Sequence, residues 1–463
     1  MAIKFYNTLT KKIEVFEKDP KETVGMYNCG PTVYDYVHIG NLRSYVFSDT
    51  IRRVLEGAGY KVNQVINLTD IGHLKSDADT GEDKMMIALR REGKPITKEA
   101  MKEIAVFYRD RFVEDIKSLN ILFPTHLEFA SDHVFADIEL IKKLDNKGYV
   151  YTTSDGVYFD TKKYPDYGIL GGLNLDKEQS ESRIGENSEK RNPSDFALWK
   201  FNTELGYESP WGAGFPGWHI ECSAMSMEYL GETFDIHTGG IDHIPVHHNN
   251  EIAQSVCATG HDFAHIWMHN AFVTLGNDAK MAKSLGNSIK FSDIKDAGIN
   301  PLAYRLWLLT AHYRKEVTFS WDALCASDTA LSRIYAIYDS FNEELELDYE
   351  IKNKYLSDFI SHMENDLDTP GAIASMWEML KDPEINEKEK MYSMFVMDKY
   401  LGLGVCGREK IEVPAEVLAL VKERDEARKN NDFKLSDELR DKIQKLGFAV
   451  KDTKDGTEIR KNS

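Results

Sequence analysis

The sequence predicts an α/β protein with a parallel sheet that is split by an inserted domain. A helical bundle and a small mixed α/β domain follow. Strand-like runs at residues 24–30 and 61–72 enclose a helical pattern at residues 41–55. Strand-like runs return at residues 234–240 and 267–276. Because parallel neighbours must be joined by a crossover, usually a helix, this order predicts a parallel sheet.

Local patterns predict the first strand, helix and strand. VGMYNCG (24–30) is strand-like and ends at a Gly-Pro break. Apolar residues recur at helical spacing over residues 41–55, and Gly57 and Gly59 predict the end of that helix. KVNQVINLTDIG (61–72) predicts a second strand that runs into a turn.

The segment between the two halves of the sheet has a different pattern. GYVYTTSDGVYFDT (148–161) predicts a hairpin about a Ser-Asp-Gly turn. We therefore expect an inserted domain at residues 119–203. The two halves of the core are then expected at residues 1–118 and 204–325.

The C-terminal third predicts two further domains. Helical patterns dominate after residue 325 and predict a helical bundle at residues 326–407. Residues 408–463 predict a small mixed domain with a helix at Ser436–Leu446 and a hairpin at residues 454–456.

Composition narrows the class of protein. The chain has 463 residues, 42% of them hydrophobic, so it can build several folded domains. A net charge of −19 argues against bulk binding of nucleic acid. Five scattered cysteines argue against a disulfide framework and favour the cytoplasm. The sequence has no uninterrupted apolar run of about 18 residues, so no membrane span is expected.

His38, Ile39, Gly40 and Asn41 stand where the first strand passes into the helix. A helix N-terminus presents unpaired N–H groups and a positive dipole end, which suit phosphate. Gly40 would let a ligand approach the backbone, and His38 can donate a hydrogen bond. Alone, the pattern more often marks a capped helix with a surface histidine.

A second loop, at residues 276–288, carries Lys280, Lys283 and Ser284 among small residues. Two flexible ammonium groups at this spacing can meet the β- and γ-phosphates of a nucleotide. The alternative is an ordinary solvated lysine loop. The two loops together favour a nucleotide site on the split core.

Cys29, Cys222, His247 and Glu251 are candidate metal ligands. His247 and Glu251 are four residues apart, so a helix places both on one face. Sets of N, S and O ligands hold zinc tetrahedrally. Buried thiols and a helical His–Glu pair are the alternatives, and spacing alone favours them. A metalloprotease is not expected, because a His-Glu-x-x-His motif is absent from the sequence.

The two loops resemble the HIGH and KMSKS signatures of class I aminoacyl-tRNA synthetases, with Asn41 and Ala282 as departures. The segments GWHIECSAMS (217–226), HHNNEIAQS (247–255) and KRNPSDFALWK (190–200) are similar to cysteinyl-tRNA synthetases in content and order. The resemblance extends over nearly the whole chain.

This resemblance implies a Rossmann-like catalytic core and an anticodon-binding C-terminal domain. It implies an ATP-dependent ligase that forms cysteinyl-adenylate from L-cysteine and transfers cysteine to the 3′ end of tRNA(Cys). One Zn²⁺ per chain, Mg²⁺ with ATP and a cytoplasmic monomer are expected. The residues it implies are His38, Lys280 and Lys283 for catalysis; Ile39, Gly40, Asn41, Lys283 and Ser284 for ATP; Thr69, Trp218, His237 and Asp242 for the substrate; and Cys29, Cys222, His247 and Glu251 for zinc.

Zinc would explain how such an enzyme tells cysteine from serine. A pocket that relies on shape separates groups of similar size by only about 1–3 kcal/mol. A thiol bound to a metal loses its proton and is a favoured zinc ligand. An alcohol is far less acidic, so a separate editing site is not expected.

In the C-terminal segment, four basic residues are candidate contacts to RNA phosphates if they share a helix face. A solvated helix pair is the alternative, because charges of both signs alternate there. The four residues are Arg424, Arg428, Lys429 and Arg440.

Three other functions remain open at this point. A ligase that joins activated cysteine to an amino sugar would share the zinc and nucleotide sites but lack the anticodon domain. A nucleotidyltransferase with a histidine–glycine loop would not need four zinc ligands. A non-catalytic, zinc-dependent tRNA-binding module would not need Lys280, Lys283 and Ser284.

Overall fold

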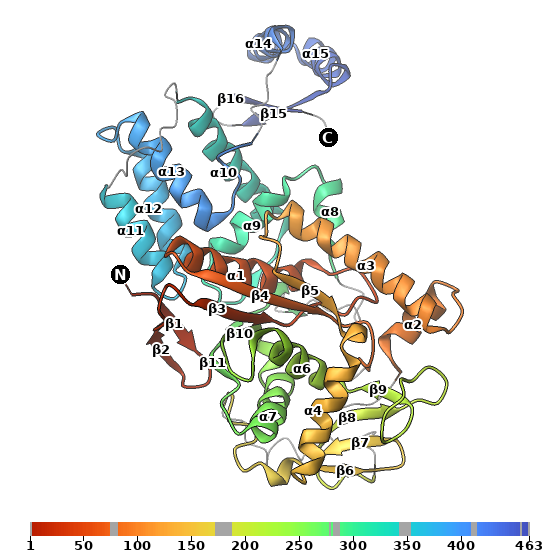
Figure 1. Cartoon of the computed structure of the whole chain (residues 1–463). Coiled ribbons are helices and arrows are strands. Elements are labelled where there is room, and N and C mark those ends of the chain that lie inside the picture. Colours follow the sequence, from red (N-terminus) through yellow and green to blue (C-terminus); the bar gives the residue numbers. More distant parts are fainter. Residues whose placement is uncertain are drawn as a thin grey trace. The chain divides into compact units, whose positions relative to one another are not determined.

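The computed structural model in Figure 1 describes residues 2–74, 82–171, 188–276, 279–280, 288–341, 353–408, 414–453 and 456–461. The chain forms two compact units, Met1–Val405 and Cys406–Ser463. The domain borders expected inside the first unit stay predictions.

A five-stranded parallel sheet in the order β11-β10-β3-β4-β5 forms the core of the first unit. The predicted parallel α/β core is confirmed, with the insertion between β5 and β10. The strands are β3 (Thr23–Asn28), β4 (Lys61–Leu68), β5 (His126–Phe129), β10 (Phe234–Gly240) and β11 (Ala264–Asn270).

The strand predicted at residues 267–276 is wrong in one respect. The chain leaves the parallel sheet after Asn270, and β12 (Val273–Leu275) joins a three-stranded sheet in the order β13-β12-β14. Its other strands are β13 (Ala279–Lys280) and β14 (Val317–Thr318). Periodicity did not reveal this break because both pieces are apolar and mostly buried.

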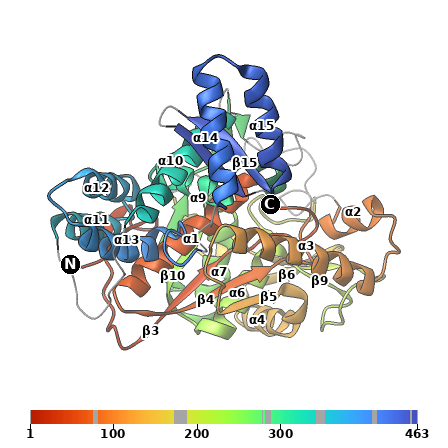
Figure 2. The same ribbon diagram turned by 90° about the horizontal axis from the view of Figure 1, so that it is seen from above.

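Helices cover both faces of the parallel sheet. Figure 1 shows α1 (Ile39–Gly57) on one side, and α6 (Trp218–Leu230) and α7 (His247–Thr259) on the other. Figure 2 gives the view from above. The predicted helix at residues 41–55 is confirmed and begins slightly earlier, because His38 caps it. This arrangement places the starts of α1, α6 and α7 near the ends of the sheet strands.

The insertion contains a four-stranded antiparallel sheet in the order β6-β7-β8-β9. The predicted hairpin is confirmed, since β6 (Val150–Thr152) pairs with β7 (Gly156–Phe159). The remaining strands are β8 (Phe196–Phe201) and β9 (Gly214–Pro216). Helix α4 (Val134–Asn146) packs against this sheet and against α6.

Most of the remaining elements of the first unit are helical, which confirms the helical region predicted after residue 325. None of the described helices combines the length and apolar character that crossing a bilayer requires. The remaining strands of the first unit are β1 (Lys4–Asn7) and β2 (Lys12–Val15). Its remaining helices are α2 (Lys84–Arg91), α3 (Lys98–Ser118), α8 (Phe291–Asp296), α9 (Pro301–Leu309), α10 (Trp321–Asp339), α11 (Lys354–Glu364), α12 (Thr369–Lys381) and α13 (Glu387–Leu401).

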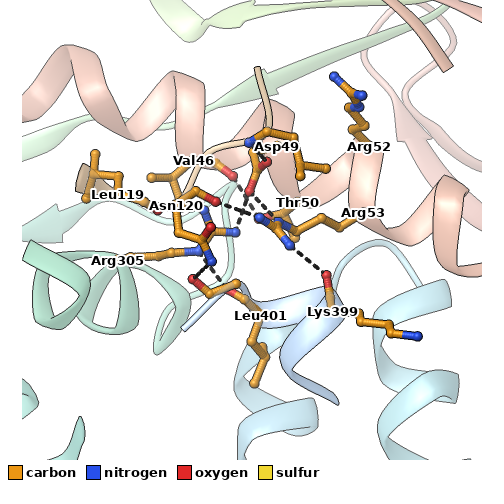
Figure 3. Close-up of polar contacts among 12 residues, drawn as sticks. Val46, Asp49, Thr50, Arg52, Arg53, Leu119, Asn120, Arg305, Lys399 and Leu401 are labelled. Carbon is orange, nitrogen blue, oxygen red and sulfur yellow. Dashed lines mark hydrogen bonds and ion pairs between the residues drawn. The ribbon is translucent and has the colours of Figure 1, made fainter. Parts of the chain in front are cut away.

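Buried charges join α13 to the core (Figure 3). Asp49 on α1 pairs with Arg53 at 2.7 Å and with Arg305 of α9 at 2.5 Å. The Arg305 Nε donates to the carbonyl of Leu401, and the Arg53 Nη1 donates to that of Lys399, at 2.6 and 2.8 Å. The last carbonyls of a helix lack partners within the helix, so the two guanidinium groups cap α13.

The second unit is a helix pair on a hairpin: α14 (Ala415–Lys429), α15 (Phe433–Lys445), β15 (Phe448–Thr453) and β16 (Gly456–Lys461). The predicted hairpin is confirmed, and α15 begins three residues earlier than expected because Asp432 caps it. The small core consists of Val417, Val421, Ile443, Phe448 and Val450.

Arg424 does not match its expected role as a phosphate contact. Its side chain is 1% exposed and donates two hydrogen bonds of 2.8 Å to the carboxylate of Asp452. Arg428 also lies 3.3 Å from Asp452. A buried, bidentate arginine stabilises the unit and is not presented to a ligand.

Candidate active site and metal centre

A cleft of about 610 Å³ opens where β3 and β10 end. Ligands of open parallel sheets bind at this edge. The loop after β3 forms one wall of the cleft, and the first residues of α6 and α7 form another.

Gly30 shapes the loop that leaves β3. A Cβ atom at this position would lie 1.5 Å from the carbonyl oxygen of Asn67, so only glycine fits. Its N–H donates to the side-chain oxygen of the same asparagine at 2.7 Å. This close approach sets the backbone beside Cys29, which lines the cleft.

The N-terminus of α1 faces the cleft through His38, Gly40 and Asn41, whereas Ile39 is fully buried. Asn41 donates its N–H to the Nδ1 of His38 at 3.2 Å. It accepts the N–H of His38 on its side-chain oxygen at 3.2 Å. The departure at Asn41 is therefore compatible with a capping box at the helix start. The positive end of the helix dipole and the histidine at this end suit a phosphate.

The four predicted metal ligands come together. Donor atoms of Cys29, Cys222, His247 and Glu251 all lie within 4.8 Å of one another. His247 Nε2 is 3.0 Å from Glu251 Oε1, yet it has no hydrogen-bond partner among the described residues. A buried nitrogen without such a partner, beside two sulfur atoms and a carboxylate, fits a metal ion.

A second group of donors, Cys29, His237, His248 and Glu251, overlaps the first. Both of its histidines are fully buried and neither lines the cleft. Cys29, which both groups share, lines the cleft, and the first group adds His247, which also lines it. An incoming ligand can therefore reach a metal held by the first group, which also has the additional thiolate that zinc favours.

The surroundings of Cys29 favour its thiolate form, which binds a cation. Burial raises the pKa of Cys29, but a hydrogen bond with Cys222 and the charges of His248 and His247 outweigh it, so this pKa lies well below its usual range. Burial, followed by the interaction with Cys29, raises the pKa of Cys222 well above its usual range. In the metal-free protein the pair thus shares its proton unequally, and a bound metal would displace the remaining one.

The pKa of His247 follows the same logic. Burial lowers it, but the negative charges of Cys29 and Glu251 raise it to about 10. The other nitrogen of His247 lies 2.8 Å from Nδ1 of His219. Burial lowers the pKa of His219, which favours its neutral form. The partner of His247 that the sequence left unidentified is therefore another histidine.

The expected substrate residues separate into two groups. Trp218 and Asp242 line the cleft. Thr69 and His237 are 1% and 0% exposed and lie behind its wall. Thr69 donates to Glu221, and His237 Nε2 lies 2.8 Å from Glu251 Oε2. His237 therefore supports a donor of the metal group, whereas Thr69 supports the buried carboxylate of Glu221, next to Cys222 in the sequence.

The expected lysine loop lies almost wholly outside the described residues. The backbone of Lys280 belongs to β13, whereas Lys283 and Ser284 are not described. Their roles stay predictions.

Sequence reasoning missed several residues of the cleft. Thr32, Tyr34 and Asp35 follow β3, and His73 and Lys84 flank the segment after β4. For Thr32, Tyr34, Asp35 and His73, the position just beyond the end of a parallel strand was the available signal, because such ends meet at one edge of the sheet.

Comparison with known proteins decides the family. Residues 15–329 match the model of the catalytic domain of class I (C) tRNA synthetases, and residues 411–460 match the anticodon-binding domain of cysteinyl-tRNA ligases. The chain belongs to the cysteine–tRNA ligases. It is therefore assigned to a family of ATP-dependent ligases, as the resemblance implied.

Curated cysteine–tRNA ligases match along nearly their full lengths. That of Burkholderia lata is 44% identical over 99% of this chain and 97% of its own length. That of Treponema denticola is 41% identical over 98% of both. Matches of this extent cover the catalytic and C-terminal parts alike.

Solved structures of other tRNA synthetases share the fold of this chain. Methionyl-tRNA synthetase of Mycobacterium tuberculosis aligns with a TM-score of 0.56 at 14% identity, over 82% of this chain and 90% of that one. The leucyl enzyme of Agrobacterium radiobacter, in a ternary complex, aligns with a TM-score of 0.60 at 12% identity, over 86% and 87%. At these identities the likeness concerns the fold alone.

Proposed function

We propose that this chain activates L-cysteine with ATP and transfers it to tRNA(Cys), with Zn²⁺ held by Cys29, Cys222, His247 and Glu251. The convergence of these four donors on a cleft that also contains the start of α1 carries the proposal. One Zn²⁺ per chain fits the donor set.

In this proposal the metal group recognises the thiol of cysteine, and the start of α1 recognises the phosphates of ATP. When Zn²⁺ is bound, it supplies affinity for thiolate sulfur and little affinity for the hydroxyl of serine. Trp218 and Asp242 line the same part of the cleft and would contact the rest of the amino acid. Glu251 is held from behind by His237, and His247 by His219, so neither ligand needs to reorganise when the thiol arrives.

Activation needs positioning rather than a protein nucleophile. The carboxylate of cysteine attacks the α-phosphate of ATP and pyrophosphate leaves. His38 and the positive end of the α1 helix dipole stabilise charge on the phosphates. Lys280 and Lys283 would contribute positive charge to the same phosphates, and Mg²⁺ would accompany ATP.

A hydroxyl of the terminal ribose of tRNA then attacks the cysteinyl carbonyl of the adenylate, an ester bond forms, and AMP leaves. The family match at residues 411–460 supports anticodon binding by the second unit. This match also favours tRNA over an amino sugar as the acceptor. A cytoplasmic monomer is part of the same proposal.

The deciding experiment uses the purified chain loaded with zinc. We expect exchange of labelled pyrophosphate into ATP that depends on cysteine, hardly any with serine, and charging of tRNA(Cys). Exchange without transfer to tRNA, but with transfer to an amino sugar, would replace the proposed acceptor. A protein that binds tRNA but supports no exchange would contradict the enzymatic role.

A further inference from the structure

One wall of the cleft is made of stacked rings. The indole of Trp218 lies 4.0 Å from the ring of His73, with only 10° between their planes. It also lies 4.3 Å from His247, at 36°. His73 is 7% exposed, whereas Trp218 is partly open to the cleft. The orientation of the indole therefore depends on a second histidine that is not one of the four proposed zinc ligands.

The ring of His73 is anchored at both nitrogens. Nδ1 lies 2.6 Å from the hydroxyl of Thr32, and Nε2 lies 2.5 Å from the ammonium of Lys84. An ammonium group has no lone pair and can only donate. Nε2 therefore accepts from Lys84, and Nδ1 carries the hydrogen and donates to Thr32. These two hydrogen bonds fix the tautomer of His73 and the plane of its ring.

The electrostatic surroundings keep this ring neutral. Burial lowers the pKa of His73 well below its usual range, and the charge of Lys84 lowers it further. A neutral ring can accept the hydrogen bond from the ammonium, whereas a protonated ring cannot. The hydrogen-bond geometry and the burial thus agree on the same state.

Backbone contacts hold His73 and Lys84 next to each other. Lys84 donates its N–H to the carbonyl of His73 at 2.9 Å, and Leu74 and Asp83 form a bridge beside this contact. Asp83 also caps α2 through the N–H of Met85. His73 and Lys84 are therefore brought together at the base of the segment that joins them.

Thr32 is tied to the same region from the other side. Thr32 and Thr69 form a parallel bridge, with Val33 donating to the carbonyl of Thr69 at 3.0 Å. The loop after β3 and the end of β4 are thus hydrogen-bonded to each other. All three members of the anchor, Thr32, His73 and Lys84, line the cleft.

We propose that His73, anchored by Thr32 and Lys84, is a positioning residue that holds the Trp218 ring and so limits the amino-acid end of the cleft to a side chain as short as that of cysteine. The inference rests on the proposed function, because it names the feature that limits substrate size. Zinc selects sulfur, and the anchored indole selects length: L-homocysteine carries the same thiol on one more methylene.

The position of the ring can be measured without activity. Protein labelled with 5-fluorotryptophan contains seven fluorinated residues, and Trp218→Phe assigns the relevant ¹⁹F signal. We expect one sharp Trp218 signal in the parent chain, and a broadened or split signal in His73→Ala and Lys84→Met. Lys94→Met is the matched control, because Lys94 pairs with Glu103 on the exposed surface. A sharp, single Trp218 signal in His73→Ala would overturn the positioning role.

Kinetics test the limit on substrate length. In pyrophosphate exchange, His73→Ala should raise KM for cysteine about tenfold, with kcat changed less than about threefold. The ratio of kcat/KM for homocysteine to that for cysteine should rise about tenfold. His73→Phe keeps a stacking ring but loses the two hydrogen bonds, so its kcat/KM ratio should lie between those of the parent chain and His73→Ala.

The outcomes separate this inference from the function on which it rests. An unchanged ratio in both His73→Ala and Lys84→Met would overturn the length limit. An equal loss of kcat for both amino acids would overturn it too, since it would indicate general damage. If His73→Ala does not fold, Lys84→Met and Thr32→Val carry the test. Failure of the parent chain to use cysteine would instead contradict the proposed function.

Discussion

The Cys29 Sγ and the Glu251 Oε1 lie 3.9 Å apart, although 222 residues separate them along the chain. Cys29 follows β3 and Glu251 lies in the first turns of α7. Since β3 and β10 are neighbours in the sheet, the strand order brings the two residues to one edge. The metal group is therefore a product of sheet topology.

Replacing Cys222 by serine should abolish both metal content and cysteine activation. Cys222 is 1% exposed and supplies one of two sulfur donors, and a hydroxyl is a poor zinc ligand at neutral pH. Metal analysis of the purified variant and pyrophosphate exchange measure the two effects. Cys325→Ser is the control, because that cysteine is exposed. Full activity of Cys222→Ser without bound zinc would refute the metal assignment.

Lys283→Ala should slow formation of the adenylate about 10²–10³-fold, while cysteine binds nearly normally. The expected reason is that an ammonium on the second loop stabilises charge that develops on the phosphates in the transition state. Single-turnover formation of adenylate and equilibrium binding of cysteine separate the two quantities. Lys94→Ala controls for the loss of a surface lysine. An unchanged activation rate would remove the assigned role.

Asp137→Asn should stabilise the protein increasingly as the pH rises. Burial raises the pKa of Asp137 well above its usual range, and the negative charge of Glu228 raises it further. Neither carboxylate oxygen of Asp137 has a hydrogen-bond partner among the described residues. A raised pKa means that the folded state holds its proton more tightly, so stability is lost as pH rises from about 4 towards the folded pKa.

The measurement is the free energy of unfolding in urea at several pH values. The difference between Asp137→Asn and the parent should grow by about 1–3 kcal/mol between pH 4 and 8. Glu139→Gln, an exposed position on the same helix, is the control. A difference that does not change with pH would show that Asp137 titrates alike in both states.

Arg305→Met should destabilise the first unit by about 3–5 kcal/mol. The change leaves Asp49 with one fewer positive partner and removes a donor from the end of α13 (Figure 3). Thermal unfolding gives the comparison, with Arg52→Met as the control on the more exposed side of α1. Arg305→Lys should recover little of the lost stability, because an ammonium cannot reach Asp49 and the carbonyls of Leu119 and Leu401 in one plane. A melting temperature equal to that of the parent would contradict this role.

The four residues of the metal group could be predicted from the sequence. Cys29, Cys222, His247 and Glu251 stand in recognisable segments, and the spacing of His247 and Glu251 depends only on helix geometry. The strands and helices of the core also follow from local periodicity. The strand predicted at residues 267–276 failed because an apolar run does not reveal where a chain changes sheets.

By itself, the sequence determined the α/β class and the order of the elements, because these depend on neighbours along the chain. Only the tertiary structure decided that His219 supports His247, that Thr69 and His237 lie behind the wall, and that Arg424 is buried. Those facts depend on which distant surfaces pack together. Burial and long-range hydrogen bonds arise from that packing, and no local spacing encodes them.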